Sequence, residues 1–122
     1  MSAAHKAVLE QANAAILKGD FDGFLKFCTE DTQWTFVGER TINGKQAVRQ
    51  WMAATYKEPP QFLVQRMIAE GDVVAALGEI TLKDEQGNTA HHAYCDVWRL
   101  RDGKLAELRA FVIETDPRLP PL

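Results

Sequence analysis

The sequence predicts an α+β fold in which three N-terminal helices pack into a strongly curved, mainly antiparallel sheet. Two observations lead to this class. Apolar residues recur at helical spacing through much of residues 3–56, and after Pro59-Pro60 strand-forming runs alternate with short turns as far as residue 115. Helices followed by strands are typical of α+β domains. Because a strongly twisted sheet folds around the helices, we expect a cone-shaped barrel with an internal cavity.

The helices begin and end at residues suited to those positions. They are expected over 3–18, over a short segment from Phe21 to Phe27, and over 45–56. Gly19 stops the first helix, and Asp20 is a suitable N-cap for the second. Gly44 precedes the third helix, which Pro59-Pro60 ends because proline cannot continue the hydrogen-bond ladder.

The strands follow from alternating or β-branched runs between turn residues. A short strand is expected over 33–37, where Trp34 and Phe36 share a face, followed by a turn and a very short strand over 38–43. The longer strands are expected over 61–70, 73–83, 89–100 and 105–115. Residues 101–104 form a hairpin turn containing Gly103. The proline-rich tail 116–122 is expected to be irregular.

Composition limits the partners of this chain. Its 122 residues are expected to form one domain, 1–122, with 46% apolar and 25% charged residues. The net charge of −3 is small and the basic residues are scattered, so we expect neither nucleic acid nor a membrane as a partner. No apolar run reaches the roughly 20 residues of a membrane-spanning helix.

The two cysteines and the start of the chain indicate a cytoplasmic protein. Cys28 and Cys95 lie in different predicted elements without metal-ligand spacing, so we expect two free thiols rather than a disulfide. Residues 1–6 lack the pattern of a secretion signal. No dependable set of metal ligands occurs, and neither a metal nor another cofactor is expected.

Asp96 is the first candidate for chemistry. It lies in the aromatic and β-branched strand 89–100 and shares a face with Tyr94 and Trp98. A carboxylate among rings costs free energy unless it is hydrogen-bonded or its pKa shifts, and such burial can make it a hydrogen-bond donor or a base at neutral pH. The alternative is an acid that pairs with a neighbouring arginine at the sheet edge.

Glu79 and His92 are the other candidate catalytic residues. One register of the hairpin sets Glu79 opposite Tyr94 and Leu77 opposite Asp96, so that two carboxylates share a face and one becomes an acid and the other a base. A shift by one residue would send Glu79 to the outer face. His92 shares the face of Asp96 and is either a general base or part of a solvated strand start.

The same interior is expected to hold a ligand pocket of a few hundred Å³. Its aromatic and aliphatic lining favours a ring-bearing or terpenoid-like molecule. The candidate ligand-binding residues are Trp34, Phe36, Trp51, Met52, Leu77, Tyr94, Trp98, Leu108 and Val112, with Ala110 on the same face and Glu114 either a third acid at the edge or solvated.

The opposite face of the last two strands is a candidate dimer contact. Apolar and alternating charged residues mix there, as in a sheet-to-sheet interface with polar rims. An ordinary exposed sheet face is the alternative. The residues are Cys95, Val97, Arg99, Glu107, Arg109, Phe111 and Ile113.

Several segments of this chain resemble the nuclear transport factor 2-like superfamily, and within it the SnoaL-like and ketosteroid-isomerase-like branch. The segments are residues 19–24 (Gly-Asp-Phe-Asp-Gly-Phe), 27–31, 44–49 (Gly-Lys-Gln-Ala-Val-Arg) and 96–105 (Asp-Val-Trp-Arg-Leu-Arg-Asp-Gly-Lys-Leu). The resemblance implies a homodimer with an apolar cavity between sheet and helices, which holds small hydrophobic or polyketide-like ligands.

The resemblance also implies roles at particular positions. Asp96 falls where steroid isomerases keep a protonated aspartic acid, which an apolar site holds neutral so that it donates to the developing oxyanion. Their general base falls at Phe36 and their oxyanion-binding tyrosine at Ala12. The water-activating set of limonene-type epoxide hydrolases falls at Glu79, Leu77 and a position near Ile113 or Glu114, so neither set is complete.

Two functions therefore follow from the sequence. The first is a cofactor-independent isomerase, cyclase or epoxide hydrolase that uses Asp96, with Glu79 or His92, for proton transfer on a small polyketide-, steroid- or terpenoid-like molecule. The second is a non-catalytic ligand-binding or dimerisation module in which Asp96 is structural. Fold similarity alone does not assign a reaction.

Overall fold

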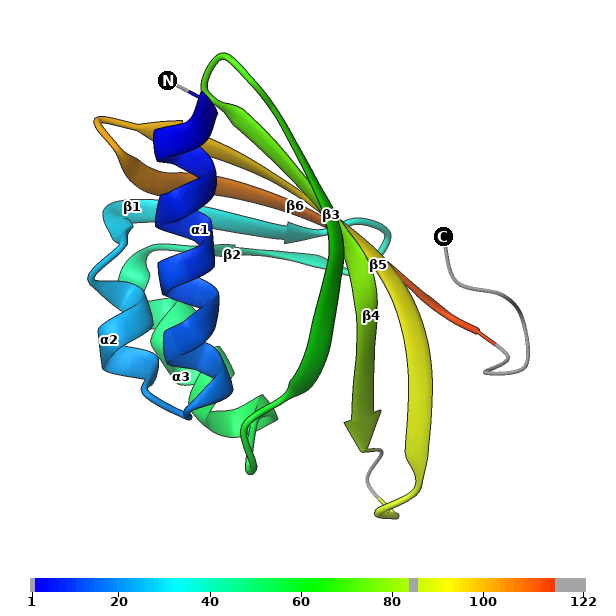
Figure 1. Cartoon of the computed structure of the whole chain (residues 1–122). Helices are drawn as coiled ribbons and strands as arrows, with labels where there is room; N and C mark the ends of the chain where they lie inside the picture. Colours follow the sequence, from blue (N-terminus) through cyan, green and yellow to red (C-terminus); the bar gives the residue numbers. More distant parts are fainter. Residues whose placement is uncertain (1, 84–85, 116–122) are drawn as a thin grey trace.

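The structure is a computed structural model that describes residues 2–83 and 86–115 (Figure 1). Within these residues, three helices and six strands follow one another along the chain. Their bounds are α1 Ser2–Leu17, α2 Phe21–Leu25, β1 Cys28–Phe36, β2 Arg40–Asn43, α3 Lys45–Thr55, β3 Gln61–Glu70, β4 Val73–Lys83, β5 Thr89–Arg101 and β6 Lys104–Glu114. The predicted irregular tail, 116–122, lies outside the described residues.

Local sequence accounts for the boundary between α1 and α2. Gly19 adopts a left-handed φ of 78°, and its N–H donates to the Ile16 carbonyl at 2.9 Å while that of Asp20 donates to Ala15 at 2.9 Å. This pair of bonds is the Schellman motif, which satisfies the last carbonyls of a helix. Asp20 then caps α2, because its carboxylate accepts from the Gly23 N–H at 2.9 Å.

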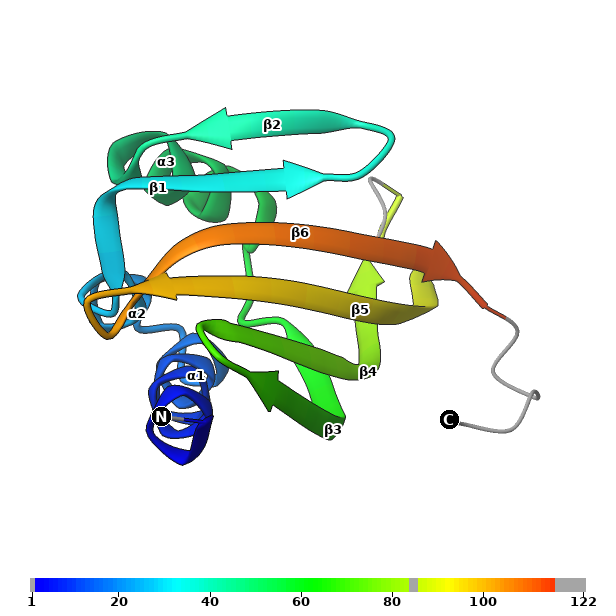
Figure 2. The same cartoon turned by 90° about the horizontal axis from the view of Figure 1, so that it is seen from above.

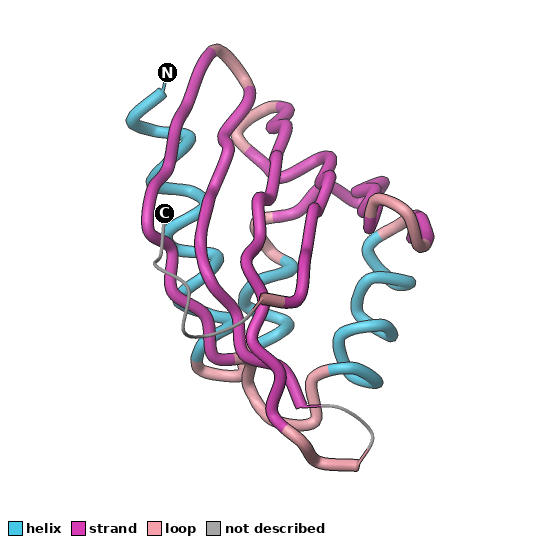
Figure 3. Tube along the Cα trace, turned by 90° about the vertical axis from the view of Figure 1, so that its right-hand side faces the viewer, coloured by secondary structure: helices cyan, strands magenta, loops and turns pink. Residues whose placement is uncertain are grey.

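The described strands form one curved sheet in the order β2-β1-β6-β5-β4-β3. All neighbouring pairs are antiparallel except β1 and β6, which run parallel. The predicted α+β class and curved sheet are confirmed. The ends of the strand order, β2 and β3, do not pair with each other, so the cone stays open along one side. Figures 2 and 3 show the helices gathered on the concave side of the sheet.

The curvature comes from irregular positions in the strands. The register shifts between Val64 and Arg66 on β3, between Cys28 and Gln33 where β1 meets β6, and between Arg99 and Leu100 on β5. Such bulges bend a strand and increase its twist. β3, β4 and β5 curve around the side on which the helices lie (Figure 1).

The hydrophobic core fills most of the space between helices and sheet. Its largest fully buried side chains include Phe24, Leu9, Met52, Leu105 and Val48. α1 packs against β3 and β4, whereas α3 packs against β1 and β2. The inward side chains of β5 and β6 therefore face either the core or the space between the contact of α1 with β3 and β4 and the contact of α3 with β1 and β2.

Most predicted elements are confirmed, with one correction to the bounds of the first strand. The first strand begins at Cys28, five residues before the expected 33, and it pairs with the last strand as well as with β2. Cys28 and Cys95 are both free thiols, as expected. Among the described residues no helix is long and apolar enough to cross a membrane.

Candidate functional site

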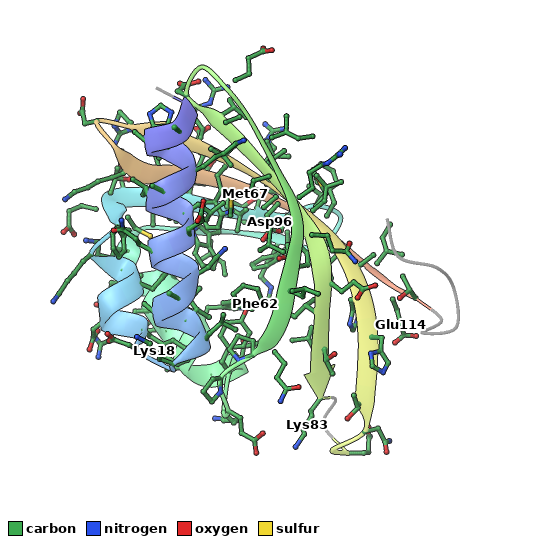
Figure 4. The ribbon with its side chains drawn as sticks, in the orientation of Figure 1. Lys18, Phe62, Met67, Lys83, Asp96 and Glu114 are labelled. Atoms are coloured by element: carbon green, nitrogen blue, oxygen red, sulfur yellow. The ribbon has the colours of Figure 1, made fainter. Side chains whose placement is uncertain are left out.

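A pocket lies between the concave face of the sheet and the helices. It measures about 90 Å³, and among residues 2–83 and 86–115 its one acidic side chain is Asp96. The lining residues are Asn13, Ile16, Trp34, Phe36, Tyr56, Pro60, Phe62, Ala76, Ile80, Tyr94, Asp96, Trp98, Leu108, Ala110 and Val112. In Figure 4, Asp96 and Phe62 lie in this interior, whereas Lys83 and Glu114 lie near the far ends of their strands.

The pocket is smaller than predicted. We expected a few hundred Å³, and an apolar cavity of about 150 Å³ is known to hold one benzene molecule. At about 90 Å³, the pocket is smaller than that cavity, so a ring-bearing ligand requires the side chains at its mouth to move. Its aromatic side chains fill much of the room that the curved sheet encloses.

Asp96 lies at the centre of the sheet with small residues on both sides. On β5 it pairs with Ala76 of β4 and Ala110 of β6, and both alanines also line the pocket. Because the side chains of these two alanines are short, the carboxyl group of Asp96 projects beyond them from the concave face of the sheet. Sequence alternation placed it there correctly between Tyr94 and Trp98.

The Asp96 carboxyl has no partner among the described residues: no side chain there donates a hydrogen bond to it or forms an ion pair with it. Asp96 is half-buried, and it lines the pocket among aromatic and small apolar residues. This burial raises the pKa of Asp96 from 3.8 to about 7, because a charged carboxylate loses its hydration. Near neutral pH the group therefore exists as both acid and base.

The predicted alternative for Asp96, a pair with a neighbouring arginine, is not what the structure contains. Arg99 is on the outer face, where it contacts Asp72 at 3.7 Å and Glu107 at 3.4 Å. Both pairs are solvent-exposed, so they contribute little to stability. Asp96 faces the pocket instead.

Aromatic rings surround the acid and pack edge to face. Trp34 and Trp98 have ring centroids 5.7 Å apart at 85°, and Phe24 lies 5.7 Å from Trp34 at 78°. Phe36 stacks on Trp51 at 4.8 Å and 33°. These contacts fix the rings, so the pocket wall next to Asp96 is apolar and rigid.

The neutral polar groups of the pocket are hydrogen-bond donors. Tyr56 and Tyr94 both line it, and burial, with the nearby charge of Asp96 as a second cause, raises the pKa of each phenol. Both phenols therefore keep their protons at neutral pH. Asn13 adds an amide from α1, and Trp34, whose indole Nε1 atom is buried, also lines the pocket.

The model of the SnoaL-like domain family matches residues 9–108. The chain belongs to the SnoaL-like family. The resemblance found in the sequence is thereby confirmed, and the matched segment includes Asp96 and all but Ala110 and Val112 of the pocket lining. No curated protein matches this sequence.

Solved structures share the fold of this SnoaL-like protein at low sequence identity. An NTF2-like protein of unknown function from Burkholderia pseudomallei has a TM-score of 0.83 at 19% identity, covering 93% of this chain and 92% of that one. An LEH-like epoxide hydrolase from M. tuberculosis has a TM-score of 0.82 at 18% identity, covering 92% and 84%. TerC, co-crystallised with polyporic acid, has a TM-score of 0.79 at 19% identity, covering 90% and 92%.

The structure of this SnoaL-like protein corrects the predicted register beside Asp96. Ala76, not Leu77, is opposite Asp96, and Gly78, not Glu79, is opposite Tyr94. Glu79 pairs with Ala93 and is exposed on the outer face. Because side chains alternate along a strand, the shift by one residue separates Glu79 from the pocket and from Asp96. No carboxylate pair forms there.

His92 and Glu114 lie beyond the pocket. His92 is on the concave face of β5, opposite Ile80 of β4 and Glu114 of β6, but it does not line the pocket. Its Nδ1 atom is buried without a hydrogen-bond partner among the described residues. Glu114 is exposed at the end of β6, as Figure 4 shows.

The candidate ligand-binding residues divide into two groups. Three of them do not line the pocket: Met52 is fully buried in the core, Trp51 packs behind Phe36, and Leu77 is on the outer face beside Cys95. The candidates that the structure does bring together around Asp96 are Trp34, Phe36, Tyr94, Trp98, Leu108 and Val112.

Sequence reasoning missed the side of the pocket that lies opposite the central strands. Asn13 and Ile16 come from α1, one helical turn apart, and Tyr56, Pro60 and Phe62 come from the end of α3 and the start of β3. The helical spacing of Ile16 marked it as buried, but not which helix face meets the pocket. Phe36, where the sequence resemblance placed the general base of steroid isomerases, lines the pocket, whereas Ala12 is buried in the core.

Proposed function

We propose that this protein catalyses proton transfer at a carbon next to a carbonyl group in a small, neutral and mostly apolar molecule. Asp96 is the group that takes and returns the proton. The observation that carries this proposal is an unpaired carboxyl, buried in a pocket of aromatic rings, that exists as acid and base near neutral pH.

The pocket lining supports a neutral substrate. Among the described residues no lysine, arginine or histidine lines the pocket, so an anionic ligand would meet the Asp96 charge without a balancing cation. The phenols of Tyr56 and Tyr94 remain protonated and can donate to an oxygen. Apolar rings provide the remaining contact surface, which suits an alicyclic or aromatic molecule.

In the proposed step, Asp96 alone accepts the proton and later returns it. Its carboxylate takes a proton from the carbon next to the carbonyl, and the electron pair of the broken C–H bond forms the enolate double bond. Negative charge then develops on the substrate oxygen, where neutral donors stabilise it. The carboxylic acid of Asp96 returns the proton to the same or to another carbon, which gives exchange or isomerisation.

The similar structures support a small organic ligand. One is an LEH-like epoxide hydrolase, and TerC was co-crystallised with polyporic acid. At identities of 18% and 19% these likenesses show the fold alone, so the reaction rests on the residues of the pocket.

Hydrogen–deuterium exchange into cyclopentanone tests this function. We expect the protein in D₂O to accelerate exchange at the two carbons beside the carbonyl, and Asp96→Asn to reduce the acceleration by about 100-fold, the lower range for loss of general-base catalysis. The rate should rise with pH and level off above about 7, because the carboxylate is the active form and burial raises the pKa of Asp96 to about 7. NMR of the ketone measures the exchange.

Glu79→Gln is the matched control, since it removes a carboxylate that is exposed on the outer face of the neighbouring strand. It should exchange the ketone at the wild-type rate. A wild-type protein that binds cyclopentanone without accelerating exchange would contradict catalysis. That result would favour the second candidate, a ligand-binding module, which agrees with the presence of only one acidic side chain in the described pocket lining.

We also propose that the outer face of the sheet pairs two copies of this chain. Large apolar residues are exposed there on two strands: on β6, Ile113 is 68% exposed and Phe111 42%, and on β3, Leu63 is 63% exposed. Leu77 and Cys95 lie between them on β4 and β5. The charged residues Arg99 and Glu107 lie at one end of this face, which supports an apolar contact with a polar rim.

Substitution of Phe111 tests the dimer. Phe111→Glu is expected to raise the dissociation constant at least about 100-fold, because it places two charges in one apolar contact. Gln46→Glu, on the exposed side of α3, is the control and should leave the dimer intact. Sedimentation equilibrium measures both. A monomeric wild type, or a Phe111→Glu dimer of unchanged affinity, would refute this interface.

A further inference from the structure

Trp34 carries a buried donor for which the described protein supplies no acceptor. Its side chain is 4% exposed, and its Nε1 atom is buried without a hydrogen-bond partner among residues 2–83 and 86–115. Buried polar groups are nearly always satisfied in native proteins, so an unsatisfied indole N–H calls for an explanation. Trp34 also lines the pocket that contains Asp96.

The surroundings of Trp34 explain why no protein group takes this hydrogen bond. Its ring neighbours are Phe24, Phe36, Trp51 and Trp98, with centroids between 5.7 and 6.4 Å away. Hydrocarbon and aromatic side chains offer no strong acceptor. Because the rings hold Trp34 on several sides, the indole cannot readily rotate toward a distant carbonyl.

The topology places this donor close to the acid. Trp34 on β1 pairs with Leu108 of β6, and Leu108 pairs with Trp98 of β5. Asp96 is the next inward residue of β5 after Trp98, and a single strand, β6, separates β5 from β1. The indole of Trp34 and the carboxyl of Asp96 therefore belong to one wall of one pocket.

We propose that Trp34 is the second polar recognition group of the pocket and that its Nε1–H donates to an oxygen of the ligand. The ligand class is a neutral molecule with a carbonyl oxygen on an apolar ring, bound so that the oxygen contacts Trp34 while a neighbouring carbon faces Asp96. The inference rests on the proposed function for its choice of ligand. It adds the residue that orients that ligand, a positioning role distinct from the proton transfer by Asp96.

The indole N–H signals of the wild-type protein test this directly. The chain has three tryptophans, so a ¹H–¹⁵N spectrum shows three indole signals, and Trp34→Phe identifies one of them. With cyclopentanone, we expect the Trp34 Nε1–H signal to move downfield as it gains an oxygen acceptor. With methylenecyclopentane, a hydrocarbon of similar shape, this downfield movement should be absent.

Affinity provides the second measurement. Trp34→Phe should bind cyclopentanone about 10-fold more weakly, the value of one net hydrogen bond, and should bind methylenecyclopentane as the wild type does. Glu79→Gln is the control, because it changes an exposed side chain on the outer face of the sheet, away from the pocket. It should bind both probes like the wild type.

The outcomes separate this inference from the proposed function. If Asp96 catalyses exchange into cyclopentanone but the Trp34 signal does not move downfield, the inference about Trp34 is wrong and the proposed function is still supported. The Trp34 N–H would then donate to the face of an aromatic ring. If cyclopentanone does not bind, both are overturned. If Trp34→Phe fails to fold, the spectra of Trp51→Phe and Trp98→Phe identify the Trp34 signal by elimination, and its downfield shift in the wild type supports the inference.

Discussion

Asp96→Asn is expected to gain stability relative to the wild type as the pH rises from 4 to 8. Burial raises the pKa of Asp96 in the folded protein to about 7, whereas an exposed aspartate in the unfolded chain has a value of 3.8. Between these values the folded state binds more protons than the unfolded state, so the wild type loses stability as pH increases. Asparagine has no charge to bury and does not follow this loss.

The expected size of the effect follows from the two pKa values. Each unit corresponds to about 1.4 kcal/mol, so the free energy of unfolding of Asp96→Asn minus that of the wild type should increase by about 4 kcal/mol across this range. The penalty in the wild type is absent below pH 3.8 and complete above about 7. Urea unfolding at a series of pH values measures it.

Glu79→Gln provides the comparison for this series. Its carboxylate is exposed on the outer face, so its difference from the wild type should vary by less than about 0.5 kcal/mol over the same range. A flat profile for Asp96→Asn would mean that the carboxyl is solvated in the folded protein. A profile of opposite sign would mean that a cation or several donors stabilise its charge.

The fold could be predicted well from the sequence because its signals are local. Gly19 and Pro59 end helices through their backbone conformation and Asp20 begins one through its side-chain cap, and the structure places these boundaries within a few residues of the prediction. The segment before Gln33 was harder to predict. Its polar residues resemble a turn, and only pairing with the distant strand β6 makes it part of β1.

The site depended on register, which is not a local property. Lys83 pairs with Thr89 in the structure, whereas the predicted register would have paired it with Ala90. Alternation along β5 decides the face of Asp96, so Asp96 lines the pocket in either register. The difference of one residue moves Glu79 to the outer face. For the same reason Leu77, which was predicted to line the pocket, lies on the outer face.

The far wall of the pocket required tertiary knowledge. Tyr56 and Pro60 lie in the connection after α3, where no periodic pattern indicates a direction for the side chain. The helical pattern correctly predicted that Met52 and Trp51 face the interior of the protein. It does not distinguish a core residue from a residue that lines a pocket. The distinction depends on the curvature of the sheet. That curvature depends on β-bulges, whose positions could not be predicted from the sequence.

Gly78→Ala is expected to destabilise the protein by about 3 kcal/mol or more and to disturb the pocket. A Cβ atom at Gly78 would lie 2.2 Å from the Leu63 carbonyl oxygen and 2.8 Å from the phenol of Tyr94. The carbonyl belongs to strand β3, which pairs with β4 at this point and cannot withdraw without loss of hydrogen bonds. Tyr94 would be pushed away from its present position, so ligand binding should weaken as well.

Gly38→Ala is the matched control for this substitution. Gly38 has a left-handed φ of 89° but open space where a Cβ would lie, so alanine there meets only the backbone cost, about 1–2 kcal/mol. The difference between the two variants in urea unfolding isolates the steric conflict at Gly78. If Gly78→Ala were no less stable than Gly38→Ala, the close approach of β3, β4 and Tyr94 would not determine the shape of the pocket. If Gly78→Ala is much less stable, the glycine is what lets the sheet bend tightly enough for Tyr94 to line the same pocket as Asp96.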